Sequence, residues 1–237
     1  MNIREKYKSE IEQVVEACRR LGELGYVTSS GGNLSLRVDD DIIIITPTKT
    51  PKRHMTFDDI CAVNLNGETV FTPEGKKPTG ETPFHVRIMN SRPDIKAIVH
   101  AHPPVLTGFA IARSDLLSQP FLPEPIIEVG PMLNVEYGTP LSQKLSENFD
   151  KVITKSNGFL MENHGALVCS TTDVSEGVEQ LQMMEAMAQS VLVARLLGNA
   201  ETISADDVTD LENVIRIRGL KMPGNTSKTL KEIYNIT

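Results

Sequence analysis

Apolar residues recur at three- and four-residue steps from Ile3 to Leu24 at the start of the chain. This spacing places them on one face of a helix, and Gly25 follows where such a helix commonly ends. Further along, Asp173 stands before a second long helical pattern that continues to about Leu197. The same reasoning predicts shorter helices over residues 84–89, 105–111, 141–149 and 206–217.

Strand patterns alternate with these helices. Residues 34–38 alternate apolar and polar side chains, whereas Ile42–Ile45 is β-branched throughout, as in a central strand. Further strands are expected over 62–65, which Asn66-Gly67 ends as a hairpin turn, and over 98–102, 158–161 and 166–169. Residues 114–140 are rich in proline and predict an irregular connection with one short strand near 126–129.

This order of elements favours one α/β domain over residues 1–237, built on a mostly antiparallel sheet. The chain shows no internal repeat and no linker of biased composition. Residues 218–237 follow the last predicted helix and are a candidate C-terminal arm.

Composition narrows the class of partner. The formal net charge of −7 argues against a nucleic acid or an anionic membrane as partner, so an anionic substrate would need locally placed positive charge. The three cysteines are scattered and indicate unpaired thiols in a reducing compartment. The N-terminus is charged, and no apolar run approaches the roughly 18 residues of a membrane span, so we expect a cytoplasmic protein.

The strand over 98–102 ends in two histidines one residue apart, His100 and His102. Successive side chains of a strand point to opposite faces, so these two share a face. Two neutral imidazoles side by side can each offer a ring nitrogen to one metal ion. A pair of ordinary core or turn histidines would show the same spacing, and the spacing alone does not separate the two interpretations.

A catalytic zinc ion takes three protein ligands and keeps one position open. The chain has five histidines, so the third ligand is sought among His54, His85 and His164. His54 lies in a basic loop, and His85 lies on a predicted helix one turn after Glu81. His164 follows an apolar strand, the same context as His102, and is our candidate for the third ligand.

Glu81 is the candidate general acid or base. It stands at a predicted helix N-terminus, where free N–H groups favour negative charge, a setting that it shares with many glutamates that do no chemistry. Three polar turns, Ser30–Asn33, Thr48-Lys49 and Thr79-Gly80, carry backbone donors and hydroxyls that suit an anion such as phosphate. Each turn is ordinary by itself, and together with the histidine pair they indicate one site.

Several short motifs occur in a fixed order along the chain. They are Gly32-Asn33-Leu34-Ser35-Leu36-Arg37, Thr46-Pro47-Thr48, Glu81 with His85, Ser91-Arg92-Pro93-Asp94, His100-Ala101-His102 and Asn163-His164-Gly165. In this ordered set the chain resembles the class II aldolase/adducin family, and within it the L-fuculose-1-phosphate aldolases. The resemblance runs from the first helix to about Gly198.

The resemblance implies a three-layer α/β/α domain around a central, mostly antiparallel sheet, assembled as a homotetramer with active sites between subunits. It implies Zn²⁺ on His100, His102 and His164, with Mn²⁺ or Co²⁺ as alternatives for such a set of ligands. Glu81 matches the family's acid/base glutamate, whereas the related epimerases carry aspartate there. The positions that match phosphate-binding residues are Gly32, Asn33, Thr48, Thr79 and Gly80.

The implied reaction is reversible retro-aldol cleavage of a ketose 1-phosphate. The products are dihydroxyacetone phosphate and a small aldehyde, formed through a metal-stabilised enediolate. Three departures bear on this expectation. Lys49 replaces a glycine and could add a cation for a phosphate or a carboxylate, Thr79-Gly80 replaces a serine pair, and Phe121 falls where the family has a tyrosine that serves the aldehyde. Tyr234 is a candidate to supply that phenol to a neighbouring subunit.

Two alternatives stay open. One is a metal-dependent decarboxylase of a phosphorylated 3-oxo sugar acid, since some members of the superfamily decarboxylate such acids through the same kind of enolate. The other is an adducin-like binding module that shares the fold without catalysis. The presence of three histidines together with Glu81 favours an enzyme over a binding module.

Overall fold

An eight-stranded sheet forms the centre of the computed structural model, which describes residues 3–236 and leaves Met1, Asn2 and Thr237 of the two termini undescribed. The strand order is β4-β3-β2-β1-β5-β8-β7-β6. In this range β6 pairs parallel with β7, and the other neighbouring strands pair antiparallel, so the sheet is mixed. The strands are β1 Asn33–Arg37, β2 Ile42–Ile45, β3 Cys61–Asn64, β4 Thr69–Phe71, β5 Ala97–Ala101, β6 Leu133–Val135, β7 Gly158–Met161 and β8 Gly165–Ser170.

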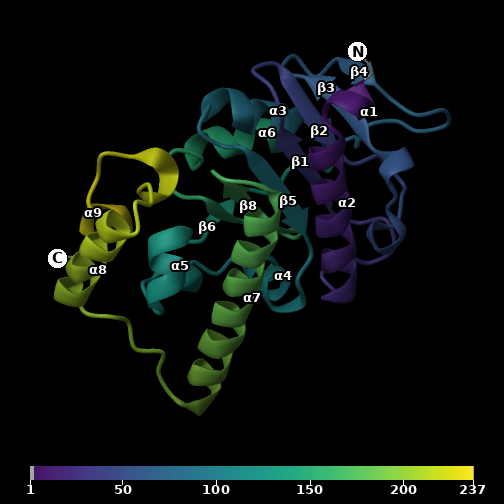
Figure 1. Ribbon diagram of the computed structural model, residues 1–237. Helices are drawn as coiled ribbons and strands as arrows, with labels where there is room; N and C mark the ends of the chain where they lie inside the picture. The colour runs from purple at the N-terminus through teal and green to yellow at the C-terminus, as the bar shows by residue number, and fades with distance from the viewer. Residues whose placement is uncertain (1–2, 237) are drawn as a thin grey trace.

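Helices cover both faces of this sheet (Figure 1). The long helices α2 (Lys8–Glu23) and α7 (Val174–Leu197) pack on one face, and α3 (Thr82–Ser91) and α6 (Gln143–Asn148) pack on the other. Strand residues alternate between the two cores. Leu34 and Leu36 of β1 join the α2/α7 core, for example, whereas Ile43 and Ile45 of β2 join the α3/α6 core. The expected three-layer arrangement is therefore present.

Most of the predicted elements form where the hydrophobic pattern placed them. The opening helix is divided at Tyr7, so a short α1 (Ile3–Lys6) precedes α2. Helix α7 begins after Asp173, whose side chain accepts a hydrogen bond from the backbone N–H of Glu176. Helices α4 (Pro104–Ala112) and α8 (Ala205–Ile217) also match the expected ranges.

The strand predicted near 126–129 is wrong, because those residues belong to helix α5 (Pro123–Glu128). Prolines are well tolerated in the first turn of a helix, and Pro123 and Pro125 both lie there. Ile126 and Ile127 then bury their side chains in a third apolar cluster with α8. Strands β4 and β6, each three residues long, were not predicted.

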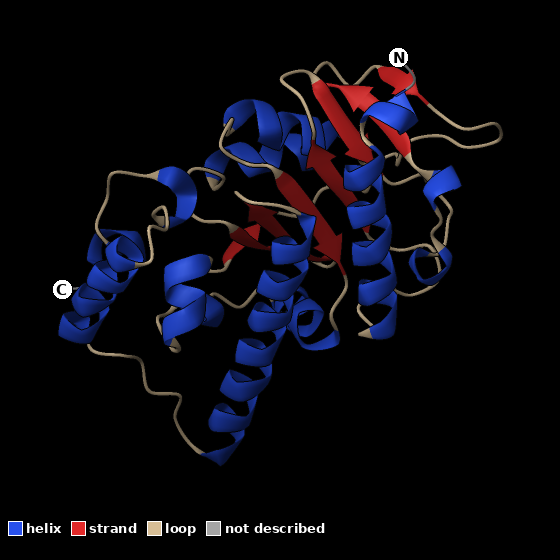
Figure 2. Cartoon of the chain, in the orientation of Figure 1, coloured by secondary structure: helices blue, strands red, loops and turns tan. Residues whose placement is uncertain are grey.

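The segment expected as a C-terminal arm folds back onto its own chain (Figure 2). It forms a short 3-10 turn, Pro223–Asn225, and helix α9 (Leu230–Tyr234), which packs beside α8. Leu230 and Tyr234 are buried in the third cluster, and burial raises the pKa of the Tyr234 phenol. Tyr234 therefore lies in the core of its own subunit, contrary to the expectation that it serves a neighbouring site.

Two smaller expectations concern the cysteines and the membrane. Cys18, Cys61 and Cys169 are buried and unpaired, as predicted. Across residues 3–236, none of the helices has the length and apolar character that crossing a bilayer demands.

The motif residue Arg92 has a structural role, since its buried guanidinium pairs with Asp94 at 2.7 Å and donates to the carbonyl of Ile153.

Candidate metal centre

His100 is the most deeply placed of the three candidate ligands. Its neighbour Ala101 joins the α2/α7 core, so the imidazole of His100 faces the α3 side of the sheet, where it is fully buried. Its Nδ1 lies 2.9 Å from the carbonyl oxygen of Ala166. A carbonyl only accepts, so Nδ1 carries the proton and the lone pair of Nε2 is left for a ligand bond.

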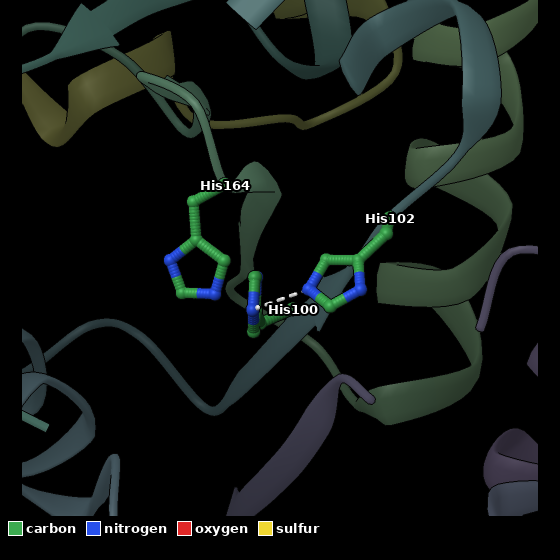
Figure 3. A group of neighbouring side chains, drawn as sticks. All are labelled: His100, His102 and His164. Atoms are coloured by element: carbon green, nitrogen blue, oxygen red, sulfur yellow. Dashed lines mark hydrogen bonds between the residues drawn. The ribbon is translucent and has the colours of Figure 1, made fainter. Parts of the chain in front are cut away.

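His102 and His164 converge on that nitrogen (Figure 3). His102 follows the end of β5, and its Nε2 lies 3.3 Å from Nε2 of His100. His164 lies in the turn between β7 and β8, and its ring centroid is 4.7 Å from that of His100 and 5.4 Å from that of His102. One ring nitrogen of each histidine lies within 4.8 Å of the others. The sequence therefore identified three residues that the fold brings together.

Two glycines permit this close approach. A Cβ on Gly165 would lie 2.5 Å from Cδ2 of the His102 ring and 2.6 Å from the carbonyl oxygen of Ala101. Gly32 has a φ of +70°, and a Cβ there would lie 2.7 Å from the carbonyl oxygen of His100. Larger residues at these positions would push apart the strand ends that carry the histidines.

The donor set fits a divalent ion. Burial lowers the pKa of His102 to about 4 and that of His100 well below its usual value, so both rings are neutral near pH 7. Two nitrogens bound at about 2.0–2.1 Å to one tetrahedral ion would lie about 3.3–3.4 Å apart, which matches the distance between His100 and His102. The buried Nδ1 of His164 has no hydrogen-bond partner among the described residues.

Glu81 lies directly beside this cluster. Its Oε2 is 3.6 Å from Nε2 of His100, and its Oε1 is 3.6 Å from Nε2 of His164. The residue stands at the N-cap position of α3 and is 7% exposed, so its carboxylate is nearly enclosed. The amide Nδ2 of Asn33 donates a hydrogen bond of 2.7 Å to Oε2. A carboxylate in this position can hold or move a proton at an atom bound next to the histidines.

The turns expected to bind an anion also meet near Glu81. The backbone N–H of Thr48 donates to the carbonyl of Lys77, and that of Thr79 donates to the carbonyl of Thr46, so the two turns run side by side. The side chains of Thr48 and Lys49 are exposed. The hydroxyl of Thr79 accepts from the backbone N–H of Glu81 at 3.3 Å, so it supports the turn that carries Glu81.

Lys49 adopts a backbone conformation that favours glycine. Its φ is +56°, in the left-handed region. The resemblance implies a glycine at this position in related enzymes, and the left-handed backbone explains that preference. A lysine here adds an exposed positive charge to the turn after Thr48 at some conformational cost.

Lys52 is a candidate site residue that sequence reasoning missed. It is 1% exposed, and its Nζ donates to the carbonyls of Ser30 and Thr50 at 3.3 and 3.2 Å. No carboxylate of the described residues forms an ion pair with it, and burial lowers its pKa. Its positive charge also helps to lower the pKa of His102. Lysines in proline-rich loops are normally exposed, so nothing in the local sequence marked it.

Comparison with known proteins shows similarity to one family. Residues 12–192 match the family model described as Class II Aldolase and Adducin N-terminal domain. A 3-oxo-tetronate 4-phosphate decarboxylase from Pectobacterium atrosepticum is 31% identical over 193 residues, which cover 79% of this chain and 85% of the relative. An L-fuculose phosphate aldolase from Methanococcus maripaludis is 33% identical over 180 residues, covering 76% and 94%.

A solved structure shows the same fold. The chain superposes on YgbL from Klebsiella pneumoniae, described as an aldolase, epimerase or decarboxylase, with a TM-score of 0.78 and 28% identity. The match covers 86% of this chain and 98% of YgbL.

Proposed function

Because the chain belongs to the Class II Aldolase and Adducin N-terminal domain family, we propose that it is a metal-dependent carbon–carbon lyase acting on a phosphorylated sugar or sugar acid. One observation carries this proposal. Three imidazoles from two separate parts of the chain converge, and a nearly enclosed carboxylate lies 3.6 Å from two of them. A divalent ion held by His100, His102 and His164 would supply Lewis acidity for an oxygen that gains negative charge as the bond breaks.

Glu81 carries the proton chemistry in this proposal. When the carbon–carbon bond of the substrate breaks, its electron pair passes to the half that retains the carbonyl oxygen. Glu81 then delivers a proton to the carbon at which the bond was broken, and it removes that proton in the reverse direction. Asn33 holds Oε2 of Glu81, and the enclosure of the carboxylate limits competition from water.

Retro-aldol cleavage of a ketose 1-phosphate is the first candidate reaction. It yields dihydroxyacetone phosphate and a small aldehyde, and it requires a base for the hydroxyl that becomes the aldehyde oxygen. The similarity to the L-fuculose phosphate aldolase from Methanococcus maripaludis supports it. Glu81 favours an aldolase over an epimerase, because the resemblance implies aspartate at this position in the epimerases.

Decarboxylation of a phosphorylated 3-oxo acid is the second candidate. It is favoured because Phe121 stands where the resemblance implies a tyrosine that serves the aldehyde. Phe121 packs against the α2/α7 core, and Tyr234 is buried in the third cluster, so neither supplies a hydroxyl to a leaving aldehyde. Carbon dioxide leaves from a carboxylate without such a group. The similarity to 3-oxo-tetronate 4-phosphate decarboxylase is consistent with this reaction.

Two lysines support an anionic substrate, because they supply local positive charge in a protein that is acidic as a whole. The chain carries a formal net charge of −7, yet Lys49 is exposed beside Thr48 and the buried Lys52 is near enough to His102 to lower its pKa. We assign the phosphate to Gly32, Asn33, Thr48, Lys49, Thr79 and Gly80. Zinc is the proposed ion because three imidazole nitrogens with one open position suit it, with manganese or cobalt as substitutes.

A homotetramer with active sites at subunit interfaces is part of the proposal. Apolar side chains are exposed along the last turns of α7, among them Leu196 at 79% and Leu197 at 85%. A groove of about 380 Å³ lies between α4 and α7, lined by Val105, Phe109 and Leu192. Exposed apolar surface of this kind is typical of a face that another subunit covers. Light scattering of the purified protein measures the number of subunits.

One assay separates the candidate reactions. The zinc-loaded protein is incubated with a panel of ketose 1-phosphates and phosphorylated 3-oxo acids, and the products are identified by mass. Release of dihydroxyacetone phosphate establishes the aldolase, and release of carbon dioxide establishes the decarboxylase. Failure to cleave any compound in either series, with the metal bound, would contradict the proposed function and favour a binding module.

A further inference from the structure

A chain of hydrogen bonds leads from Glu81 into the core. Asn33 donates from Nδ2 to Oε2 of Glu81 at 2.7 Å. Its Oδ1 lies 2.6 Å from Nε2 of His85, and Nδ1 of His85 lies 2.7 Å from Oγ of Ser35. All four side chains are buried, and that of His85 is completely enclosed. The catalytic carboxylate is therefore connected to a histidine of α3 that is not among the candidate metal ligands.

While Glu81 is a carboxylate, the donors and acceptors of this chain of hydrogen bonds can be arranged in only one way. An amide oxygen accepts and does not donate, so the proton between Asn33 and His85 belongs to Nε2 of His85. Burial lowers the pKa of His85 to about 3, so its ring is neutral and carries this one proton. Nδ1 must then accept from the hydroxyl of Ser35. Turning the amide of Asn33 around would set its oxygen against the carboxylate of Glu81, where two acceptors would face each other.

The network lies in the core, where apolar side chains would avoid the cost of burying polar groups. The strand register points Asn33 and Ser35 toward α3, on the same face as the core residue Ile98. Buried polar groups are costly unless each is fully hydrogen-bonded, so such a network is expected to serve a specific arrangement. This network ends on Glu81, where it determines the orientation of the Asn33 amide.

We propose that His85 is a positioning residue for Glu81, which holds the amide of Asn33 with its NH₂ group toward the carboxylate. The inference rests on the proposed role of Glu81 in carbon–carbon cleavage. Without the Nε2–H donor of His85, the amide of Asn33 is free to turn, and Glu81 loses the hydrogen bond that fixes Oε2. The carboxylate then leaves the position that it holds beside His100 and His164.

Two substitutions of His85 test this role. His85→Leu removes the donor, whereas His85→Gln places an amide N–H near the position of Nε2. We expect His85→Leu to lower kcat by about 10- to 100-fold, with KM and the metal content per chain unchanged, and His85→Gln to restore most of the turnover. Undiminished kcat in His85→Leu, or equal loss in both variants, would overturn the proposal.

A spectroscopic measurement tests the same proposal without relying on the reaction. Nitrogen-15 NMR of the full-length protein identifies which nitrogen of His85 carries the proton, and we expect it on Nε2. Ser35→Ala, a smaller change than either substitution of His85, should leave Nδ1 without its donor and lower kcat less than His85→Leu does. A proton on Nδ1 in the unaltered protein would overturn the proposal. A protein with the expected tautomer that cleaves no substrate would instead refute the proposed function.

Discussion

Asn33 on β1 lies directly opposite His100 on β5 in the register of the sheet. Opposite side chains of an antiparallel pair point to the same face, which here is the face covered by α3. The amide that holds Glu81 and the most deeply buried candidate ligand are therefore placed together by strand pairing. A slip of one residue would turn Asn33 toward α2 and α7 and separate it from Glu81.

Replacing Glu81 should separate catalysis from metal binding. The substitution Glu81→Gln keeps the size and shape of the side chain, but glutamine cannot exchange a proton as a carboxylate does. We expect turnover to fall by about 100- to 10,000-fold, with the metal content per chain unchanged. Steady-state kinetics and elemental analysis measure the two quantities. Glu179→Gln, on the exposed face of α7, is the matched control. Near-normal turnover in Glu81→Gln would remove this residue from the mechanism.

Adding one methyl group at Gly165 should weaken the metal site. The new Cβ would lie 2.5 Å from the ring of His102, which must move away from its position beside His100. We expect the affinity for Zn²⁺ to fall by about 10- to 100-fold, as judged by competition with a chelator. Gly108→Ala is a suitable control, because a Cβ there has no atom within 4 Å. Equal affinities in the two variants would show that the fit around His102 is looser than described.

Lys49 offers a test of the proposed anion binding at the turn formed by Thr48 and Lys49. Lys49→Asn removes the charge, and asparagine tolerates the left-handed backbone at φ +56°. Loss of about 1.4 kcal/mol of interaction with a phosphate or carboxylate should raise KM about tenfold with little change in kcat. Lys144→Asn removes an exposed charge from α6 and should leave KM unchanged. An unchanged KM in Lys49→Asn would exclude Lys49 from substrate binding.

The buried histidines should make the metal-free protein sensitive to acid. Burial lowers the pKa of His85 to about 3 and that of His102 to about 4, whereas an unfolded histidine titrates near about 6.5. Below that value the unfolded chain binds protons that the folded chain does not, so the free energy of unfolding falls as the pH falls. Each histidine contributes a slope of about 1.4 kcal/mol per pH unit until its folded pKa is reached.

Urea unfolding at several pH values measures this slope. His85→Gln should flatten it by the share of one histidine, because glutamine does not titrate. A variant with the same slope as the unaltered protein would show that His85 is protonated in the folded state.

The convergence of the three candidate metal ligands was predictable because their signals were local. His100 and His102 ended an apolar strand, and the chain held only three other histidines from which to choose His164. Helix α9 also had a local signal that went unused. Thr229 and Glu232 form a capping box, in which each side chain accepts the other's backbone N–H.

Other features depend on contacts distant in sequence. Strand β6 has only three residues and is defined by parallel pairing with β7, about 25 residues further along the chain. Ile126 and Ile127 have the composition of a strand, but the prolines before them and the packing against α8 make them helical. The local sequence around Lys52 predicts an exposed loop lysine, whereas the fold buries the side chain near enough to His102 to lower the pKa of that histidine.

The central claim is that His100 and His102, together with the sequence-distant His164, hold one divalent ion, and counting bound ions measures it most directly. The metal-free protein is reconstituted with Zn²⁺, and the bound ion is quantified per chain in the unaltered protein and in His164→Ala. We predict one ion per chain in the former and loss of tight binding in the latter, with the fold retained by circular dichroism. Tight binding of one ion in His164→Ala would contradict the account.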